Sequence, residues 1–459
     1  MSRSNHKELN TREAEVVALA DITSQPMTAE SPAGPQRSGI SASDGAQPPL
    51  TKVSASFLAW VTIAAFGTAV AFIVPTSYSL AVRVSELAPD HEEYLGYVLG
   101  AAQIFYLVLS PLIGLWSDGT RSRFGRRSPF IVGGSILGFA ALVGIALAPN
   151  VTVMALIWMF GLLGWGTSQQ AIINRQADRV PEEQRGRISA LSGVANQIAP
   201  AIGVGIAAAV HSNIFLVFVV PGLIGLILSL TLPFIKREAS TRHMLKGPAV
   251  TAKMLFSSYI FNPRESRDFA WNWLGRFIFF IGLYFNTSYA TFFYAQRLGL
   301  PVKDIAGTVA IIGLSGVVIA SVAGLLGGFL SDKLRRRRLF ILIGALVFVV
   351  GGITEAFAHS FAQLLVGAAV MQLSIAAFNA VDQAIVLAVI PDRSQIGRYL
   401  AVVAFAQKIP SAIAPLIATV ILTLTATEAG KDYTSLYLLG TALALVGGLL
   451  IFFRVKSVR

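Results

Sequence analysis

The sequence predicts an all-α integral membrane protein with twelve membrane-spanning helices in two six-helix bundles and both chain ends in the cytoplasm. Three observations predict this fold. Of the 459 residues, 54% are hydrophobic and only 13% are charged, whereas soluble proteins carry about 25% charged residues. The apolar residues fall into runs of the length that crosses a bilayer. Short sequence matches also recur between the two halves of the chain at nearly constant spacing.

The composition excludes several classes of protein. The chain contains no cysteine, which rules out disulfides, thiol nucleophiles and thiolate metal sites. Its five histidines form no HExxH or clustered pattern, and we expect no metal and no cofactor. We find no nucleophile–base set and no P-loop, and therefore expect no enzyme activity. The net charge of +12 lies in short loops between apolar runs, which argues against nucleic acid as a partner.

Twelve apolar runs are long enough to span a membrane. The first is long enough to be tilted or bent, and Pro75 within it favours a bend. The expected spans are 54–84, 94–116, 129–148, 151–173, 187–210, 213–235, 268–293, 303–330, 338–357, 360–389, 398–424 and 433–455.

Alternate loops differ sharply in charge, and this difference predicts orientation. One side carries most of the arginines, including Arg126, Arg127 and the run 335–338, while the other side carries few cations. The positive-inside rule places the basic side in the cytoplasm of a multi-pass protein of the cell membrane. The predicted units are a disordered cytoplasmic tail (1–50), an N-terminal bundle (51–236), a cytoplasmic linker (237–267) and a C-terminal bundle with a short tail (268–459).

An internal repeat relates the two bundles. The segment PTSY at 75–78 matches NTSY at 286–289, and Trp60 matches Trp271, both at an offset of 211 residues. The segment GLWSD at 114–118 matches GFLSD at 328–332 at an offset of 214. Because six helices separate the copies, both copies have the same orientation in the membrane. This is the plan in which a substrate lies between two halves near the bilayer midplane.

The repeated GxxxD segments, each followed by a basic cluster, resemble the signature of the major facilitator superfamily. The helix count, the linker and both motif copies extend this resemblance over roughly residues 51–456. A narrower segment, PLIGLWSDGTRSRFGRRSPFI at 111–131, is similar to the corresponding loop of sucrose–proton and glycoside–cation symporters. That group carries an acidic residue in its fourth helix, where this chain reads WMFGLLGWGTSQQ.

The resemblance implies a gating motif at the cytoplasmic side. In the family, the motif aspartate contacts the start of a helix in the other half and holds the halves together. Here the pairs are Asp118 with Arg398 and Asp332 with Arg187, and Arg126 or Arg127 reaches Asp178. The alternative is that the arginines only fix topology and bind anionic lipid. The predicted gating residues are Gly114, Asp118, Gly125, Arg126, Arg127, Asp178, Arg187, Gly328, Asp332 and Arg398.

Two charged residues are predicted near the bilayer midplane, where charge is costly and usually marks function. Asp382 lies roughly 13 Å inward from Pro391, and Lys408 roughly 16 Å inward from Gly397, at 1.5 Å per helical residue. We interpret Asp382 as the protonatable group, whose charge Lys408 controls. The alternative is a static Asp382–Lys408 pair that braces two helices.

Amides at corresponding depths of the other half complete the predicted cavity, since sugar hydroxyls need mixed donors and acceptors. For these amides the alternative is interhelical hydrogen bonding. We expect Arg276 to extend to water at the cytoplasmic end, and Glu355 and His359 to meet water at the outer end. The predicted cavity residues are Asp382, Lys408, Gln169, Gln170, Asn196, Gln197, Gln383, Gln407, Gln103, Arg276, Asn286 and Asn379.

The sequence therefore predicts a secondary active transporter that works by alternating access, with proton-coupled uptake of a sugar or glycoside as the preferred function. Proton-driven efflux of small organic or drug-like molecules is the first alternative, because it suits the apolar walls and the missing acid of the fourth helix. A non-transporting membrane receptor on the same fold is the second. The expected partners are a small-molecule substrate, protons and membrane lipid, with no obligate protein partner.

Overall fold

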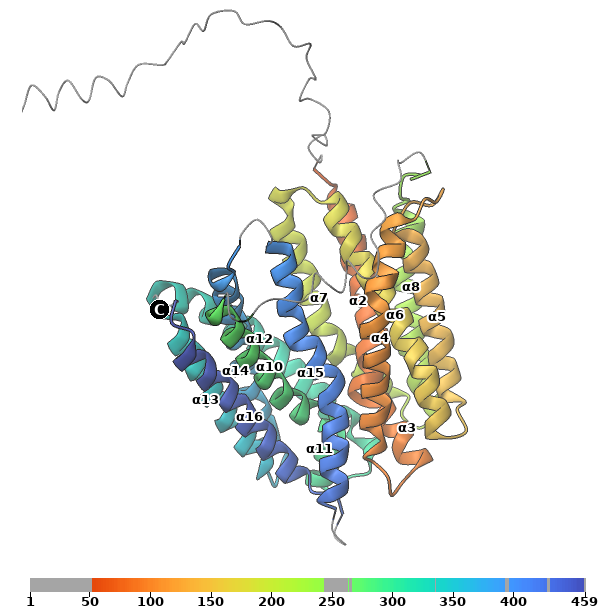
Figure 1. Ribbon diagram of the computed structural model, residues 1–459. Coiled ribbons are helices and arrows are strands. Elements are labelled where there is room, and N and C mark those ends of the chain that lie inside the picture. The colour runs from red at the N-terminus through yellow and green to blue at the C-terminus, as the bar shows by residue number, and fades with distance from the viewer. Residues whose placement is uncertain are drawn as a thin grey trace, which may run out of the picture. The chain divides into compact units, whose positions relative to one another are not determined.

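The computed structural model describes residues 52–242, 263, 266–334, 336–392, 396–426 and 430–457. The predicted tail 1–50 and most of the predicted linker 237–267 lie outside the described residues. Long helices form the described chain, as Figure 1 shows.

The first half begins with a helix that changes its winding midway. α2 (Ala55–Val74) continues through a π-helical turn, η1 (Pro75–Ser79), into α3 (Leu80–Leu87). Proline removes a backbone donor, and π turns occur where the regular helical ladder is interrupted. The structure thus has a π turn at the place where a bend was expected from Pro75. The half continues with α4 (Tyr94–Gly119), α5 (Ser128–Ala146), α6 (Val151–Arg179), α7 (Glu182–Ala209) and α8 (Ile214–Ile235).

The second half also begins with an interrupted helix. α10 (Arg267–Ser288) ends one residue before α11 (Ala290–Leu298), so that Tyr289 separates them. This break lies 211 residues after Tyr78 in η1, at the matching place of the sequence repeat. A short 3₁₀ turn follows, and then the remaining helices. They are η2 (Val302–Ile305), α12 (Ala306–Leu334), α13 (Arg337–Ala356), α14 (Phe361–Val389), α15 (Ile396–Leu424) and α16 (Tyr433–Arg454).

Within the described residues, 11 helices are long and apolar enough to cross a membrane, against the twelve expected. The predicted span 268–293 is the one outside this set. Its helix, α10, carries Arg267, Asp268 and Arg276, which make it more polar than its neighbours.

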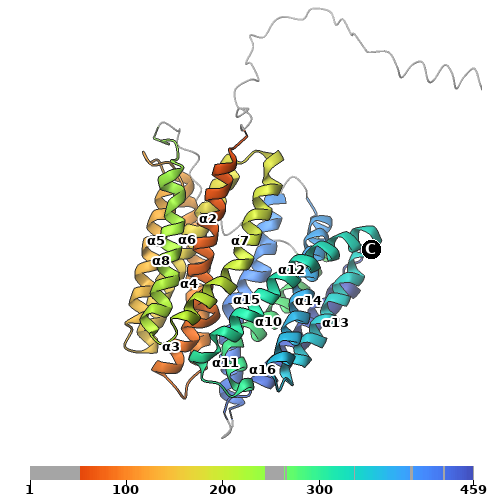
Figure 2. The same cartoon turned by 180° about the vertical axis from the view of Figure 1, so that it is seen from behind.

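The pairs of packed helices in the first half recur in the second. α2 packs against α8 as α10 packs against α16, and α5 packs against α6 as α13 packs against α14. Contacts between the halves also come as a matched set, because α4 lies along α15 and α7 lies along α12. Figures 1 and 2 show these helices from opposite sides. The packing therefore follows the repeat seen in the sequence.

Two ends of the helical assembly are distinguished by their loops. We call the end with the α4–α5 loop the Asp118 end and the end with the α3–α4 loop the Glu93 end. Since each long helix crosses from one end to the other, both ends draw on both halves of the chain.

Candidate functional site

A cavity of about 490 Å³ lies between the two halves. It receives side chains from α2 and its π turn, α4, α6 and α7 on one side, and from α10 to α15 on the other. Polar and aromatic groups share the lining with aliphatic ones. The polar and aromatic lining residues are Phe72, Thr76, Ser77, Gln103, Trp158, Tyr284, Asn286, Thr287, Ser288, Thr291, Tyr294, Glu355, Gln372 and Ser411.

The repeated segments PTSY and NTSY meet at this cavity. Thr76 and Ser77 reach it from the π turn, and Thr287 and Ser288 reach it from the end of α10. The hydroxyl of Thr291 donates to the carbonyl of Ser77 at 2.6 Å and joins the two interrupted helices directly. The two helix breaks therefore supply equivalent polar walls on opposite sides of one space.

Of the twelve predicted cavity residues, Gln103 and Asn286 line the cavity. Asn286 is buried, and its amide nitrogen donates to Thr441 at 3.4 Å. Gln169 instead bonds Asn196 at 3.2 Å, and Gln170 bonds Asn174 at 2.9 Å within α6. The lining of the main cavity does not include the remaining predicted residues of this set, namely Asn196, Gln197, Gln383, Gln407, Asn379, Asp382, Lys408 and Arg276.

The expected Asp382–Lys408 pair is wrong. Asp382 is fully buried, with 0% exposure, and its Oδ2 accepts from Nη1 of Arg276 on α10. Lys408 is exposed on α15. The expectation that Arg276 extends to water is wrong for the same reason, because Arg276 is only 8% exposed and its guanidinium lies 5.3 Å from the ring centre of Phe280. Helical spacing does not show which neighbouring helix faces Asp382.

Glu355 differs from the expectation that it meets water. It is 2% exposed, lines the cavity, and its Oε1 accepts from the hydroxyl of Tyr294 at 3.2 Å. A Cβ on Gly367 of α14 would lie 2.6 Å from the Glu355 Cγ. Glycine at that position thus leaves room for the acid between helices. The sequence signal that could have found it is this glycine, since small residues at helix interfaces allow close approach.

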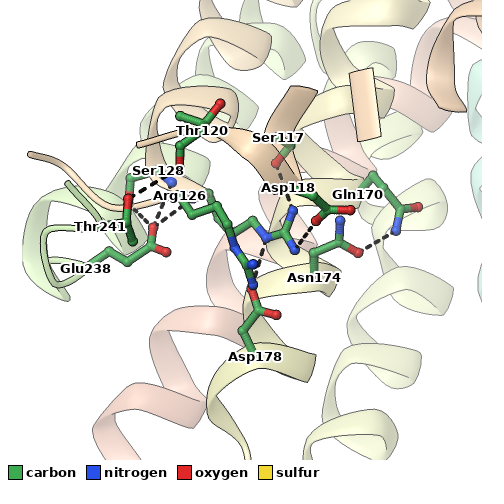
Figure 3. A network of polar contacts seen from close by, with 11 residues as sticks. Ser117, Asp118, Thr120, Arg126, Ser128, Gln170, Asn174, Asp178, Glu238 and Thr241 are labelled. Atoms are coloured by element: carbon green, nitrogen blue, oxygen red, sulfur yellow. Dashed lines mark hydrogen bonds and ion pairs between the residues drawn. The ribbon is translucent and has the colours of Figure 1, made fainter. Parts of the chain in front are cut away.

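A charged cluster at the Asp118 end holds the first half together (Figure 3). Arg127 is 4% exposed and reaches Asp118 at 2.6 Å, Asp178 at 2.9 Å and the Ser117 hydroxyl at 2.9 Å. Arg126 reaches Asp178 at 2.8 Å. Burial tends to lower the pKa of Arg127, but the carboxylates of Asp178 and Asp118 outweigh burial and raise its pKa. Both arginines therefore bind the acid at the end of α6.

Glu238 completes this cluster, a role that sequence analysis did not predict. Its Oε2 accepts from the backbone nitrogens of Arg127 and Ser128 at 3.0 and 2.9 Å, and from the Ser128 hydroxyl at 3.1 Å. The carboxylate thereby satisfies free amides at the start of α5 and offsets the positive end of the helix. Gly125 has a φ of 88°, and its α-carbon lies against the Glu238 side chain. Larger residues would be strained there.

The expected contact between Asp118 and Arg398 is not formed in this structure. Asp118 is 57% exposed along its side chain and binds Arg127 of its own half, while Arg398 lies over the ring of Tyr399. Arg187 is exposed, and Gly114 has open space where a Cβ would stand. The structure does not describe the surroundings of Gly328 or the side chain of Asp332.

At the Glu93 end, matched tyrosines cross between the halves. The Tyr78 hydroxyl donates to the carbonyl of Lys303 at 2.6 Å, and the Tyr289 hydroxyl donates to the carbonyl of Glu93 at 2.9 Å. Each tyrosine belongs to the helix break of its half, and each acceptor lies at the entrance to the next long helix of the other half. Thr419 of α15 also donates to the Glu93 carbonyl at 2.9 Å.

Charged side chains reinforce this closure. Lys431 lies 2.9 Å from the Glu93 carboxylate, and the His91 ring lies 3.0 Å from it. Burial acts to raise the pKa of Glu93, but hydrogen bonds from His91 and Lys431 outweigh it and lower the pKa. Glu92 accepts a hydrogen bond from Tyr433 of α16, and burial raises the pKa of Glu92. The Glu93 end is thus closed by several bonds between the halves.

Comparison with known proteins identifies the family to which this architecture corresponds. The sequence profile of the Major Facilitator Superfamily matches residues 53–326 and 316–459. Among curated proteins, the human "Proton-associated sugar transporter A" is 36% identical over 85 residues, which is 18% of this chain and 11% of the relative. The chain therefore matches only about a tenth of that relative's length.

Solved structures show the same fold at low identity. The crystal structure of a D-xylose–proton symporter is 17% identical, with a TM-score of 0.65 over 88% of this chain and 98% of that chain. The crystal structure of the nucleoside transporter NupG is 10% identical, with a TM-score of 0.70 over 87% of this chain and 99% of that chain. At these identities the likeness shows the fold alone.

Proposed function

The chain belongs to the Major Facilitator Superfamily, whose members are membrane transporters and not enzymes, and from this premise we propose that it takes up a sugar or glycoside together with protons. In this proposal the chain crosses the membrane twelve times, in two bundles of helices, and α10 is the seventh span. It lies in the cell membrane with its Asp118 end and both chain ends in the cytoplasm, because the arginine-rich loops gather at that end.

The observation that carries the substrate class is the chemistry of the cavity between the halves. Amides from Gln103 and Gln372 and hydroxyls from both helix breaks supply donors and acceptors on opposite walls. A polyol can satisfy these amides and hydroxyls, while the aromatic ring of Tyr284, which also lines the cavity, packs against its apolar ring edges.

Alternating access is supported by where the halves are joined. Among the contacts given for the described residues, those between the halves gather at the Glu93 end, whereas the cluster of Arg126, Arg127, Asp118 and Asp178 binds within one half. We interpret this arrangement as the state that is open toward the cytoplasm. The predicted gating contacts of Asp118 and Asp332 belong to the opposite state, in which the Asp118 end closes.

Transport in proteoliposomes that contain a pH-sensitive dye tests this proposal. A panel of sugars and glycosides is added outside, and the expected result is acidification of the interior that depends on substrate and disappears with a protonophore. Gln103→Leu removes one amide side chain from the cavity lining. It should raise the apparent KM and so weaken substrate-dependent acidification at least tenfold. Tyr97→Phe on the same helix, whose side chain is exposed, is the matched control and should leave the response unchanged.

Proton-driven efflux of an apolar organic molecule is the second candidate, because aliphatic and aromatic side chains line much of the same cavity. Leu99, Leu162, Val204, Ile312 and Met371 are among them. In inverted vesicles, efflux would appear as dye accumulation that is driven by an imposed pH gradient and insensitive to sugars. A sugar response in the proteoliposome assay without dye movement would exclude it.

A further inference from the structure

Among the described residues of the second half, two acids are buried, Glu355 and Asp382, and Glu355 is the one that lines the cavity. Asp382 is held by Arg276 away from the cavity lining. Glu355 lines the cavity, and within the described chain no lysine, arginine or histidine lies within ion-pair distance of its carboxylate. The charge of Asp382 is neutralised by Arg276, whereas the charge of Glu355 is left to be neutralised by a proton or other cation that enters the cavity.

We propose that Glu355 is the proton-binding group of the transport cycle, a role that rests on the proposed proton-coupled uptake. Its Oε1 is positioned by the hydroxyl of Tyr294 on α11. Its Oε2 accepts no hydrogen bond in the described part of the chain and is the atom to which the proton adds. The step forms one O–H bond at Oε2 and breaks none within the protein.

Groups from every neighbouring element are consistent with this role. α13 packs against α12, α14 and α16. The nearest cation on α11, Arg297, donates to the carbonyl of Ala356 and to Thr434 and is thereby committed elsewhere. Tyr437 of α16 is buried beside the site, and His359 is exposed beyond the helix end. A proton is therefore the cation that can offset an ionised Glu355 when the cavity is closed, since burying an unpaired charge is costly.

The position of Glu355 also links proton binding to substrate and conformation. Tyr294 lines the same cavity and belongs to α11, which follows the helix break at Tyr289. The break carries the hydrogen bond from Tyr289 to Glu93 that closes one end. Movement of α11 as that end opens would carry the Tyr294 hydroxyl away from Glu355. The proton site on α13 is therefore in direct contact with α11, the element that follows the helix break.

Separate measurement of exchange and of net uptake tests the proposal. In proteoliposomes, Glu355→Gln should retain exchange of labelled substrate across the membrane and lose substrate-induced acidification at least tenfold. Glu86→Gln, an acid on α3 with a 43% exposed side chain, is the matched control and should keep both. Unchanged acidification by Glu355→Gln would overturn the role of Glu355 while leaving proton-coupled uptake intact.

Tyr294→Phe sharpens the assignment to this pair. The hydroxyl stabilises the ionised carboxylate, so its loss should move the pH profile of uptake to higher pH. A purely structural role for Tyr294 would lower uptake at all pH values without moving the profile. An unmoved profile contradicts the positioning role.

Infrared difference spectroscopy measures the protonation of carboxyl groups directly. It tests the proposal even when no substrate is known or when Glu355→Gln folds poorly. Wild-type protein in liposomes should show the carbonyl band of a protonated carboxylic acid that disappears at alkaline pH. Glu355→Asp, which keeps a carboxyl group, should shift this band, and Asp382→Asn should leave it in place. A titrating band that is lost in Asp382→Asn and unmoved in Glu355→Asp would overturn the proposal, whatever the uptake assays show.

Discussion

The two ends of the molecule use polar groups in opposite ways. At the Glu93 end, a tyrosine hydroxyl from each half donates to a backbone carbonyl of the other half, and Lys431 of the second half binds the carboxylate of Glu93 in the first. At the Asp118 end, Arg126 and Arg127 bind acids of their own half. The difference shows that the polar bonds at the Glu93 end join the two halves and so stabilise one arrangement of them. The polar bonds at the Asp118 end join helices within the first half and so stabilise that half.

The close approach of α4 and α15 near the Glu93 end gives the largest expected effect. A Cβ on Gly96 would collide with the carbonyl of Pro415, the hydroxyl of Tyr289 and Thr419. Overpacking of this kind costs about 1–3 kcal/mol, so Gly96→Ala should disfavour the closed Glu93 end and lower uptake by roughly 5- to 150-fold. Gly133→Ala, where a Cβ has open space, is the control. Equal uptake by the two variants would show that the halves do not close at Gly96.

Substitution of Arg127 tests the role of the Asp118 end in the comparison. Its removal leaves Asp118 and Ser117 without their partner inside one bundle. Hydrogen bonds to charged groups contribute about 2 kcal/mol, so Arg127→Ala should lower the free energy of unfolding by about that amount, seen as a lower thermal midpoint in detergent. Arg123→Ala removes an exposed cation beside Phe124 and should leave the midpoint unchanged. A shifted conformational equilibrium with normal stability would mean that this cluster also controls opening.

The matched tyrosines are expected to have smaller effects. Tyr289→Phe and Tyr78→Phe each remove one hydrogen bond between the halves, worth about 1 kcal/mol, or roughly fivefold in the equilibrium. Tyr78→Phe should have the larger effect, because the Glu93 carbonyl keeps its bond from Thr419. Labelling of a cavity cysteine from the outside measures the shift. Labelling rates equal to those of Tyr97→Phe would show that these bonds do not favour closure.

The smallest effect is a dependence on acid pH. Glu93 has a lowered pKa, so its contribution is present above its ordinary value of 4.5 and is lost as the pH falls through the lowered value. Glu92 has a raised pKa, and its proton is already bound in that range. The Glu93 end should therefore open slightly below about pH 4.5. Glu93→Gln should remove this dependence, which outside labelling across that pH range measures.

The sequence predicted what run length and residue type control. Eleven expected spans follow from the length of the hydrophobic runs. The π turn at Pro75 follows from the missing backbone donor of proline. The contacts of Arg126 and Arg127 with Asp178 follow from opposite charge. The superfamily was also identified correctly from the paired GxxxD segments.

The partners of buried polar groups could not be predicted in the same way. Helical spacing led us to pair Asp382 with Lys408, but the packing of α10 brings Arg276 to it. Glu355 was expected at water because it is near a helix end, and its burial depends on the space beside Gly367 on another helix. Glu238 reaches α5 across the fold from the start of the predicted linker. Each outcome depends on which helices face one another.

Distances between spin labels at the two ends test the central claim that the halves rock about the cavity. The chain contains no cysteine, so pairs can be introduced without background at exposed positions. Ser212 and His359 report the Glu93 end, and Arg185 and Arg336 report the Asp118 end. On addition of a transported substrate and acid, the first distance should increase while the second decreases. Two distances that stay fixed, or that change in the same direction, would contradict the account.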